Sequence, residues 1–212
     1  MSSDHLIFDL DGTISDPKIG IARSINFALE SHDFHTKDHD EIGRLIGIPL
    51  DQMYSKLIGV TETTLISSLI MKYRERYLDV GYSENTLYEG ILTLLKFFHS
   101  ETRFRLGICT SKRKETATKI LEMFELAQLF EFISGGDIGV EKHQQLGQLL
   151  HKNMISQASL MIGDRFIDIR GAKRNKLGSG AVLWGYGSMV ELQQELPDYV
   201  FMNPSEIKVL AE

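Results

Sequence analysis

The chain has little of what marks extracellular, membrane-bound or disulfide-stabilised proteins. Its single cysteine, Cys109, excludes an intrachain disulfide, and it lies in an apolar run where a small core residue is expected. No apolar run approaches the ~18 residues of a membrane-spanning helix. Four aspartates fall within the first twenty residues, a pattern that secretory signals do not have. We therefore expect a cytoplasmic protein.

Basic residues are also too few for a nucleic-acid-binding protein. Lysine and arginine number 23 against 29 aspartates and glutamates, which gives a net charge of −6. Binding to a phosphate backbone needs a basic surface, so we expect no nucleic-acid partner. Since no apolar run is long enough to span a membrane, we also expect no membrane partner. A small phosphorylated ligand stays possible, because its pocket needs only local positive charge. With 212 residues, 42% of them hydrophobic, the chain suits one ordinary domain with an insertion, or two small domains.

The most informative stretch is an apolar segment near the start, followed at once by two aspartates. Residues 6–8 and Leu10 read as a buried parallel strand, and Asp9 and Asp11 fall at its carboxyl end. The Asp11-Gly12 pair on its own is typical of a turn. That explanation leaves Asp9 unaccounted for, since a buried charge is costly unless it is paired or bound to a metal. Ligands of open α/β sheets bind at this end of the strands.

The rest of the chain has two textures. Helical spacing of apolar residues dominates from about 18 to 82, with helices expected near 19–31, 51–57 and 64–79. From Gly90 onward, helices alternate with strands expected at 104–109, 130–134, 158–162, 181–184 and 199–201. Such alternation predicts an α/β fold with a parallel sheet. We expect a core domain of residues 1–16 plus 86–212 and an inserted helical domain of residues 17–85.

Three histidines lie close together in the helical segment. His32, His35 and His39 are three or four residues apart, so one helix face could present them to a metal. Neighbouring aspartates and lysines favour a solvated connection instead.

Polar residues follow several of the expected strands. Asp9 and Asp11 follow the first, Thr110 the next, and Asp164 and Asp168 a later one. Carboxylates that converge at one sheet edge repel one another unless a cation neutralises them, and oxygen ligands select a hard ion such as Mg²⁺. An acidic metal site beside a lysine and a hydroxyl suits phosphoryl transfer.

These segments together resemble the motifs of the haloacid dehalogenase-like (HAD) superfamily. Asp9–Thr13 resembles motif one, Thr110-Ser111-Lys112 motif two, Lys142 motif three, and Gly163–Asp168, in the form GDxxxD, motif four. The helical insertion is similar to the C1-type cap of the phosphoglycolate phosphatase-like branch. The resemblance covers nearly the whole chain. It implies a Rossmann-like parallel sheet with an inserted all-helical cap domain.

The resemblance also implies catalytic roles. Asp9 would be the nucleophile that forms an aspartyl-phosphate, and Asp11 the acid that protonates the leaving group and then activates water. Thr110 and Lys142 would bind phosphoryl oxygens. The small residue that often follows the family's lysine is missing after Lys142, so Lys112 is the alternative.

The implied metal is Mg²⁺. Its ligands would be the Asp9 carboxylate, the Asp11 backbone carbonyl and Asp164, with Asp168 supporting them by orienting a metal-bound water or the lysine. Arg165 stands between two of these acids and is expected to be an ion pair rather than a catalytic group.

Substrate contacts are predicted from two places. Gly12, Thr13 and Ser111 belong to the motifs themselves. In the cap, the loop around Arg44 and Gly47 is the expected recognition segment, because glycine allows close approach and arginine pairs with an anionic leaving group. A plain helix break with a solvated arginine is the alternative. Two short connections would let the cap close over the site as a lid.

The sequence thus predicts a Mg²⁺-dependent phosphatase for a small phosphorylated metabolite such as phosphoglycolate, a sugar phosphate or a nucleoside monophosphate. The alternative is a phosphomutase of the β-phosphoglucomutase kind, which shares these motifs. A dehalogenase needs no metal, so Asp11 and Asp164 argue against one. A non-catalytic binding module is a weaker alternative, because every expected catalytic group is present. We expect a monomer or a weak homodimer.

Overall fold

The structure is a computed structural model that describes residues 5–137 and 139–212. The chain divides into two compact units. The core unit consists of Met1–Asp16 and Leu87–Glu212, and the helical unit consists of Pro17–Thr86.

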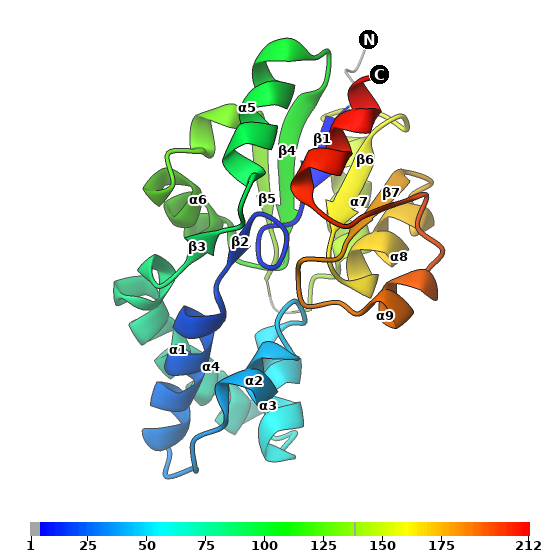
Figure 1. The fold of residues 1–212 in the computed structure, drawn as a ribbon. Helices are drawn as coiled ribbons and strands as arrows, with labels where there is room; N and C mark the ends of the chain where they lie inside the picture. The colour runs from blue at the N-terminus through cyan, green and yellow to red at the C-terminus, as the bar shows by residue number, and fades with distance from the viewer. Residues whose placement is uncertain (1–4, 138) are drawn as a thin grey trace. The chain divides into compact units, whose positions relative to one another are not determined.

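Six parallel strands form the sheet of the core unit, in the order β5-β4-β1-β6-β7-β8 (Figure 1). The strands are β1 (His5–Phe8), β4 (Arg105–Thr110), β5 (Phe132–Gly135), β6 (Leu160–Gly163), β7 (Gly178–Val182) and β8 (Tyr199–Phe201). Phe8 of the central strand β1 pairs with Ile108 of β4 on one side and Ile162 of β6 on the other. The segments that follow these three strands therefore start side by side. The predicted α/β class with a parallel sheet is confirmed.

Helices cover both faces of this sheet, as its continuous apolar strands require. They are α5 (Ile91–Glu101), α6 (Lys114–Met123), α7 (Lys142–His151), α8 (Phe166–Arg174) and α9 (Met189–Gln193), with the 3-10 helices η2 (Ala127–Leu129) and η3 (Pro204–Ala211). Ile7, Cys109 and Met161 pack into one cluster with apolar side chains of α7 and α8. Side chains alternate along a strand, so Leu6 and Phe8 point to the opposite face, and both are buried there.

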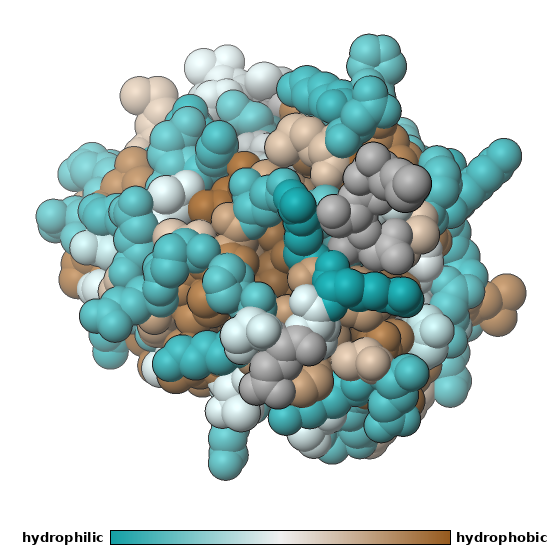
Figure 2. Space-filling model, turned by 90° about the horizontal axis from the view of Figure 1, so that it is seen from above, coloured by the Kyte–Doolittle hydropathy of each residue, from teal (hydrophilic) through white to brown (hydrophobic). Residues whose placement is uncertain are grey.

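Charged and polar side chains pair at the end of the sheet where the strands begin. Glu131 lies 2.6 Å from Arg105 Nη1 through Oε1 and 2.7 Å from His5 Nε2 through Oε2. Figure 2 shows the molecule from this end, where hydrophilic and hydrophobic residues are interspersed. These contacts connect neighbouring strand starts.

The helical unit is built from packed helices. They are α1 (Lys18–Glu30), α2 (His39–Gly43), α3 (Leu50–Ile58), α4 (Thr63–Asp79) and the short 3-10 helix η1 (Gly81–Ser83). α1 packs against α2 and α4, and α3 packs against α4. Ile25, Tyr54 and Leu69 are fully buried between them. This unit therefore has a hydrophobic core of its own.

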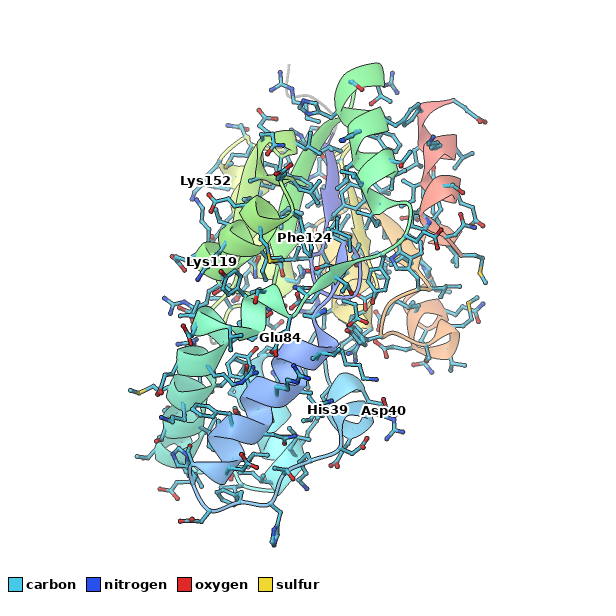
Figure 3. All side chains as sticks on the ribbon, turned by 60° about the vertical axis from the view of Figure 1, so that its left-hand side comes forward. His39, Asp40, Glu84, Lys119, Phe124 and Lys152 are labelled. Atoms are coloured by element: carbon cyan, nitrogen blue, oxygen red, sulfur yellow. The ribbon has the colours of Figure 1, made fainter. Side chains whose placement is uncertain are left out.

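A charged group joins α1 to the end of α4. Glu84 accepts from Arg23 Nη1 at 2.6 Å and from Arg76 Nη1 at 2.9 Å, and Arg76 Nη1 also donates to Ser24 Oγ at 3.0 Å. Figure 3 labels Glu84 at this junction. The hydrogen bond from Arg76 is the largest single effect on the Glu84 carboxyl, and its pKa lies below the usual range. We call Arg23, Arg76 and Glu84 the arginine–glutamate group.

Two short strands mark the crossings between the units. β2 (Ser15–Asp16) and β3 (Thr86–Leu87) pair with each other in a separate two-stranded sheet. Within the described residues, every helix falls short of the length and apolar character needed to cross a bilayer.

Candidate active site

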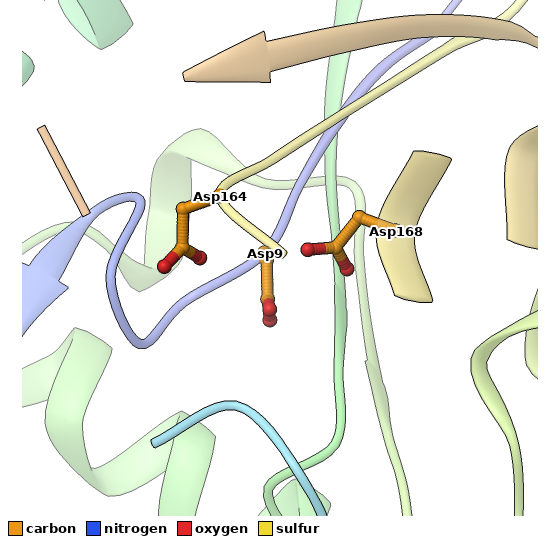
Figure 4. A group of neighbouring side chains, drawn as sticks. All are labelled: Asp9, Asp164 and Asp168. Atoms are coloured by element: carbon orange, nitrogen blue, oxygen red, sulfur yellow. The ribbon is translucent and has the colours of Figure 1, made fainter. Parts of the chain in front are cut away.

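The loops after β1 and β6, together with the start of α8, bring three aspartates to one edge of the sheet (Figure 4). Carboxylate oxygens of Asp9, Asp164 and Asp168 lie within 4.8 Å of one another, and all three side chains are buried. The backbone N–H of Asp9 donates to the Ile162 carbonyl at 2.9 Å, which holds the end of β1 against β6. We call these three residues the acidic cluster.

The tight turn that follows Asp9 contacts Asp164 of the acidic cluster. Gly12 has φ +82°, and its N–H donates to the Ser15 carbonyl at 2.8 Å. A Cβ at Gly12 would overlap the Asp164 carboxylate, so only glycine fits there. The next residue, Thr13, donates from Oγ1 to Asp164 Oδ1 at 3.2 Å. The turn thus holds one oxygen of Asp164.

Lys142, the first residue of α7, is the basic group of this cluster. Its Nζ donates to the Cys109 carbonyl at 2.6 Å and lies 2.9 Å from Asp168 Oδ1 and 3.2 Å from Asp9 Oδ1. Burial by itself would lower the pKa of Lys142, but the two carboxylates outweigh it and the pKa is raised. The lysine stays protonated at neutral pH.

Lys112 has a different partner. Its Nζ lies 2.9 Å from Asp11 Oδ2, so Lys142 rather than Lys112 stands beside Asp9. Burial raises the pKa of Asp11, an effect that Lys112 opposes. Thr110 is buried at the end of β4, where its Oγ1 accepts from the Lys112 N–H at 3.2 Å, and Ser111 between them is half-buried.

Asp168 is held from two directions. Its Oδ2 accepts from the Arg165 N–H at 3.1 Å in the first turn of α8, and its Oδ1 faces Lys142. Burial raises the pKa of Asp168 to about 6, although Lys142 lowers it. The Arg165 side chain points elsewhere: its Nε lies 2.8 Å from Glu191 Oε1. Arg165 is thus an ion-paired residue at the border of the cluster.

The acidic cluster fits a hard divalent cation. Burial raises the pKa of Asp164 well above the usual range, and Asp168 and Asp9 raise it further. Such shifts show that three buried carboxylates with one lysine are short of positive charge. Oxygen donors alone match Mg²⁺. Within the described residues, this is the only group of three metal-ligating side chains with that spacing. The histidines of the helical unit do not form one, and His32 Nε2 instead lies 2.7 Å from Ser68 Oγ.

The residues predicted for substrate recognition in the cap lie in the helical unit. Arg44 follows α2 and is exposed, and Gly47 lies in the loop before α3 with φ +102°. Both residues belong to the helical unit, and their contact with substrate stays a prediction.

Sequence reasoning missed the loop after β7. Trp184 Nε1 donates to the Thr13 carbonyl at 3.0 Å, and the Tyr186 N–H donates to Asp164 Oδ2 at 2.8 Å. A Cβ at Gly185 would overlap the Gly12 carbonyl. Aromatic residues alternating with glycines directly after a strand are the signal in the sequence that could have indicated this close approach.

A parallel sheet that carries buried acids and a lysine at its carboxyl edge defines an α/β enzyme of phosphoryl chemistry. The chain belongs to the haloacid dehalogenase-like hydrolases, because the profile of that family matches residues 6–182. The predicted family is therefore confirmed.

Curated relatives and solved structures agree with this placement. The chain is 32% identical to a 5'-nucleotidase of Pseudomonas aeruginosa, over 98% of this chain and 95% of the relative. It is 29% identical to a phosphoglycolate phosphatase of Aquifex aeolicus, over 98% and 96%. The crystal structure of a predicted phosphatase from Clostridium acetobutylicum superposes with a TM-score of 0.91 at 30% identity and 99% coverage of both chains. The chain is accordingly a phosphoric monoester hydrolase of the phosphoglycolate phosphatase-like branch.

Proposed function

We propose that this chain is a Mg²⁺-dependent phosphatase that cleaves a small phosphorylated metabolite through an aspartyl-phosphate on Asp9. The observation that carries the proposal is the position of Asp9, a buried carboxylate 3.2 Å from the Lys142 ammonium and within 4.8 Å of Asp164 and Asp168. One group of side chains thereby combines a nucleophile, a fixed positive charge and a cation site.

Asp9 is oriented for attack. In the part of the chain that the structure describes, its side-chain contacts fall on Oδ1, which accepts from the Leu10 N–H at 2.7 Å and faces Lys142. Oδ2 is left to attack phosphorus. The new bond joins Asp9 Oδ2 to phosphorus while the ester P–O bond breaks and its electron pair leaves with the alkoxide oxygen.

Asp11 supplies the protons. Its carboxylic acid gives a proton to the departing alkoxide, and the resulting carboxylate then takes one from a water molecule. The hydroxide so formed attacks phosphorus, which releases phosphate and restores the Asp9 carboxylate. The contact of Asp11 Oδ2 with Lys112 Nζ, 2.9 Å long, holds this carboxyl in place.

The remaining motif residues hold the phosphoryl group. Lys142 is fixed by the Cys109 carbonyl and Asp168, so its charge needs no rearrangement before the reaction. Thr110 and Ser111 at the end of β4, with the backbone of the Gly12 turn, supply further donors.

Mg²⁺ would be held by the Asp9 carboxylate, the Asp11 backbone carbonyl and Asp164, with Asp168 supporting this set. When bound, it supplies positive charge that neutralises the phosphoryl oxygens and the acidic cluster.

The relatives support a nucleoside monophosphate or phosphoglycolate as the substrate class, since one relative is a 5'-nucleotidase and another a phosphoglycolate phosphatase. The loop of Arg44 and Gly47 would choose among such leaving groups.

A panel of phosphorylated metabolites, assayed for phosphate release with Mg²⁺ and after chelation, tests the proposal. We expect Mg²⁺-dependent release from one or a few of them, and none from the same panel with Asp9→Asn. Release that persists after chelation would contradict the metal requirement. Substrate conversion without phosphate release would indicate the mutase instead.

A further inference from the structure

The loop after β7 connects the acidic cluster to Asp16, where the chain leaves the core unit for the helical unit. On one side, Tyr186 donates its backbone N–H to Asp164 Oδ2 at 2.8 Å, while Thr13 takes the other oxygen at 3.2 Å. These two donors fix the plane of the Asp164 carboxylate. Trp184 Nε1 donates to the Thr13 carbonyl at 3.0 Å, so the same loop also steadies the second donor.

On its other side, the Tyr186 side chain reaches the crossing at Asp16. Its hydroxyl donates to Asp16 Oδ1, and the Tyr88 side chain is a neighbour of the same hydroxyl. Asp16 is the last residue of the core unit before the helical unit, and Tyr88 is the second residue after the chain returns. All three side chains are half-buried, and burial raises the pKa of both tyrosines, so both hydroxyls stay protonated. We call Asp16, Tyr88 and Tyr186 the crossing triad.

The loop that carries Tyr186 is packed tightly against Asp164, the proposed metal ligand. A Cβ at Gly185 would overlap Asp164 and the Gly12 carbonyl, and one at Gly187 would overlap the Asp164 carbonyl. The loop backbone thus lies directly against Asp164 on both sides of Tyr186. Close-packed contacts of this kind pass on small shifts, because there is no room for them to be absorbed.

We propose that Tyr186 is a positioning residue for the metal site: its hydroxyl, held by Asp16, fixes the loop whose backbone N–H orients Asp164, and this sets the affinity for Mg²⁺. The inference rests on the proposed function. Neither Tyr186 nor Tyr88 needs to touch the substrate. The consequence is that the crossing at Asp16 is connected to Asp164 through hydrogen bonds within the core unit.

The test is the affinity for Mg²⁺ of the full chain carrying Tyr186→Phe, measured by calorimetric titration of MgCl₂ without substrate. Partners that orient a metal ligand typically change metal affinity by tenfold or more, so we expect binding about tenfold weaker than in the wild type. Hydrolysis of p-nitrophenyl phosphate should show the same shift in its Mg²⁺ half-saturation. At saturating Mg²⁺, kcat and KM should return to near the wild-type values.

Tyr199→Phe is the matched control, since it removes the same hydroxyl from a 44% exposed tyrosine on the edge strand of the same unit. It should leave Mg²⁺ binding unchanged. Asp16→Asn, which removes the charge of the acceptor, should weaken Mg²⁺ binding in the same direction as Tyr186→Phe but by less, and it provides the test if Tyr186→Phe fails to fold.

Three outcomes would overturn the inference. If the wild type binds Mg²⁺ and both Tyr186→Phe and Asp16→Asn bind it equally well, the positioning role is wrong while the proposed function stands. If Tyr186→Phe lowers kcat at saturating Mg²⁺ with an unchanged half-saturation, the hydroxyl acts elsewhere. If the wild type itself binds no Mg²⁺, the proposed metal site fails, and the inference fails with it.

Discussion

The arginine–glutamate group of the helical unit and the acidic cluster of the core unit use charge in opposite ways. In the first, one carboxylate, Glu84, faces two guanidinium groups. In the second, three buried carboxylates share Lys142. The first arrangement joins helices, because every charge has a partner of opposite sign. The second leaves an excess of negative charge that a cation and a phosphoryl group would relieve, so local stability is given up where function requires it.

The pKa values shift in opposite directions for the same reason. Hydrogen bonds from Arg76 and Arg23 hold the pKa of Glu84 below its usual range, although desolvation opposes them. Burial and the neighbouring acids raise the pKa of Asp164. Folding therefore favours the ionised form of Glu84 and opposes that of Asp164. Substitutions at the two places should consequently differ in sign as well as in size.

The largest expected effect is the loss of turnover in Asp9→Asn. An amide is a poor nucleophile and an uncharged ligand, so kcat for p-nitrophenyl phosphate should fall by about 10⁴-fold or more. The circular dichroism spectrum should stay that of the wild type. Asp33→Asn, at an exposed aspartate in the helical unit, is the control and should keep full activity. Substantial activity in Asp9→Asn would rule out the covalent intermediate.

The next effect separates the acidic cluster from the arginine–glutamate group through stability. Mg²⁺ at about 100 times its Kd should raise the free energy of unfolding of the wild type by about 2.7 kcal/mol, because it binds only the folded state. Asp164→Asn should lose this response, while in EDTA it should be at least as stable as the wild type, since one of three repelling charges is gone. Urea unfolding with and without Mg²⁺ measures both. An equal Mg²⁺ response in the two proteins would place the cation elsewhere.

Glu84→Gln should have the opposite sign. Loss of the carboxylate leaves Arg76 with a neutral acceptor, and hydrogen bonds between charged groups contribute about 2 kcal/mol, so we expect destabilisation of about that size. Mg²⁺ should stabilise this variant as much as the wild type. The control is Glu75→Gln, which removes an exposed pair with Lys72 and should cost about 0.5 kcal/mol or less. Equal losses in the two variants would show that the Glu84 pairs behave as surface pairs.

Acid should remove the same stabilisation. The pKa of Glu84 is lower in the folded state than its ordinary value of 4.5. The stabilisation is therefore fully present above that ordinary value and is lost as the pH falls through the folded pKa. The difference in unfolding free energy between the wild type and Glu84→Gln should therefore shrink as the pH is lowered from 6 to 3.5. A constant difference in urea titrations across this range would contradict the assignment.

The smallest expected effect concerns recognition by the helical unit. Arg44→Ala should raise KM about fivefold for a nucleoside monophosphate or phosphoglycolate, an energy of about 1 kcal/mol that suits a solvent-exposed ionic contact. Hydrolysis of p-nitrophenyl phosphate should change much less, because its aryl group needs little from this loop. The matched control for Arg44→Ala is Lys56→Ala on α3. Equal loss on every substrate, or no change on any, would contradict a recognition role for Arg44.

Much of the core could be predicted from the sequence, because its signals are local. A buried strand followed by Asp9 and Asp11, and another followed by Asp164, are enough to place these residues at one edge once the sheet is known to be parallel. Lys142 is a different case. Its contact with Asp9 depends on where α7 begins and on the Cys109 carbonyl, neither of which the residues around the lysine specify.

The errors have a physical cause. β7 runs from Gly178 to Val182, whereas the sequence predicts a strand at 181–184. Glycine is disfavoured in strands, so residues 178–180 read as a turn. In the structure, a Cβ at Gly178 would crowd Leu160, and one at Gly180 would crowd Phe201, so the neighbouring side chains occupy the space. The role of the Trp184–Gly187 loop could not be predicted for a similar reason, because it depends on the close approach of backbone segments that are distant in the sequence.

The central place of β1 has a consequence for synthesis. This strand is synthesised before both of its partners, which are residues 105–108 and 160–162. The apolar residues Leu6–Phe8 can therefore be buried on both sides only after β4 and β6 have been synthesised. Pairing over such separations is slow, and an unpaired apolar strand is prone to aggregate meanwhile. Production of this protein should thus depend on slow translation or chaperone assistance more than its modest size suggests.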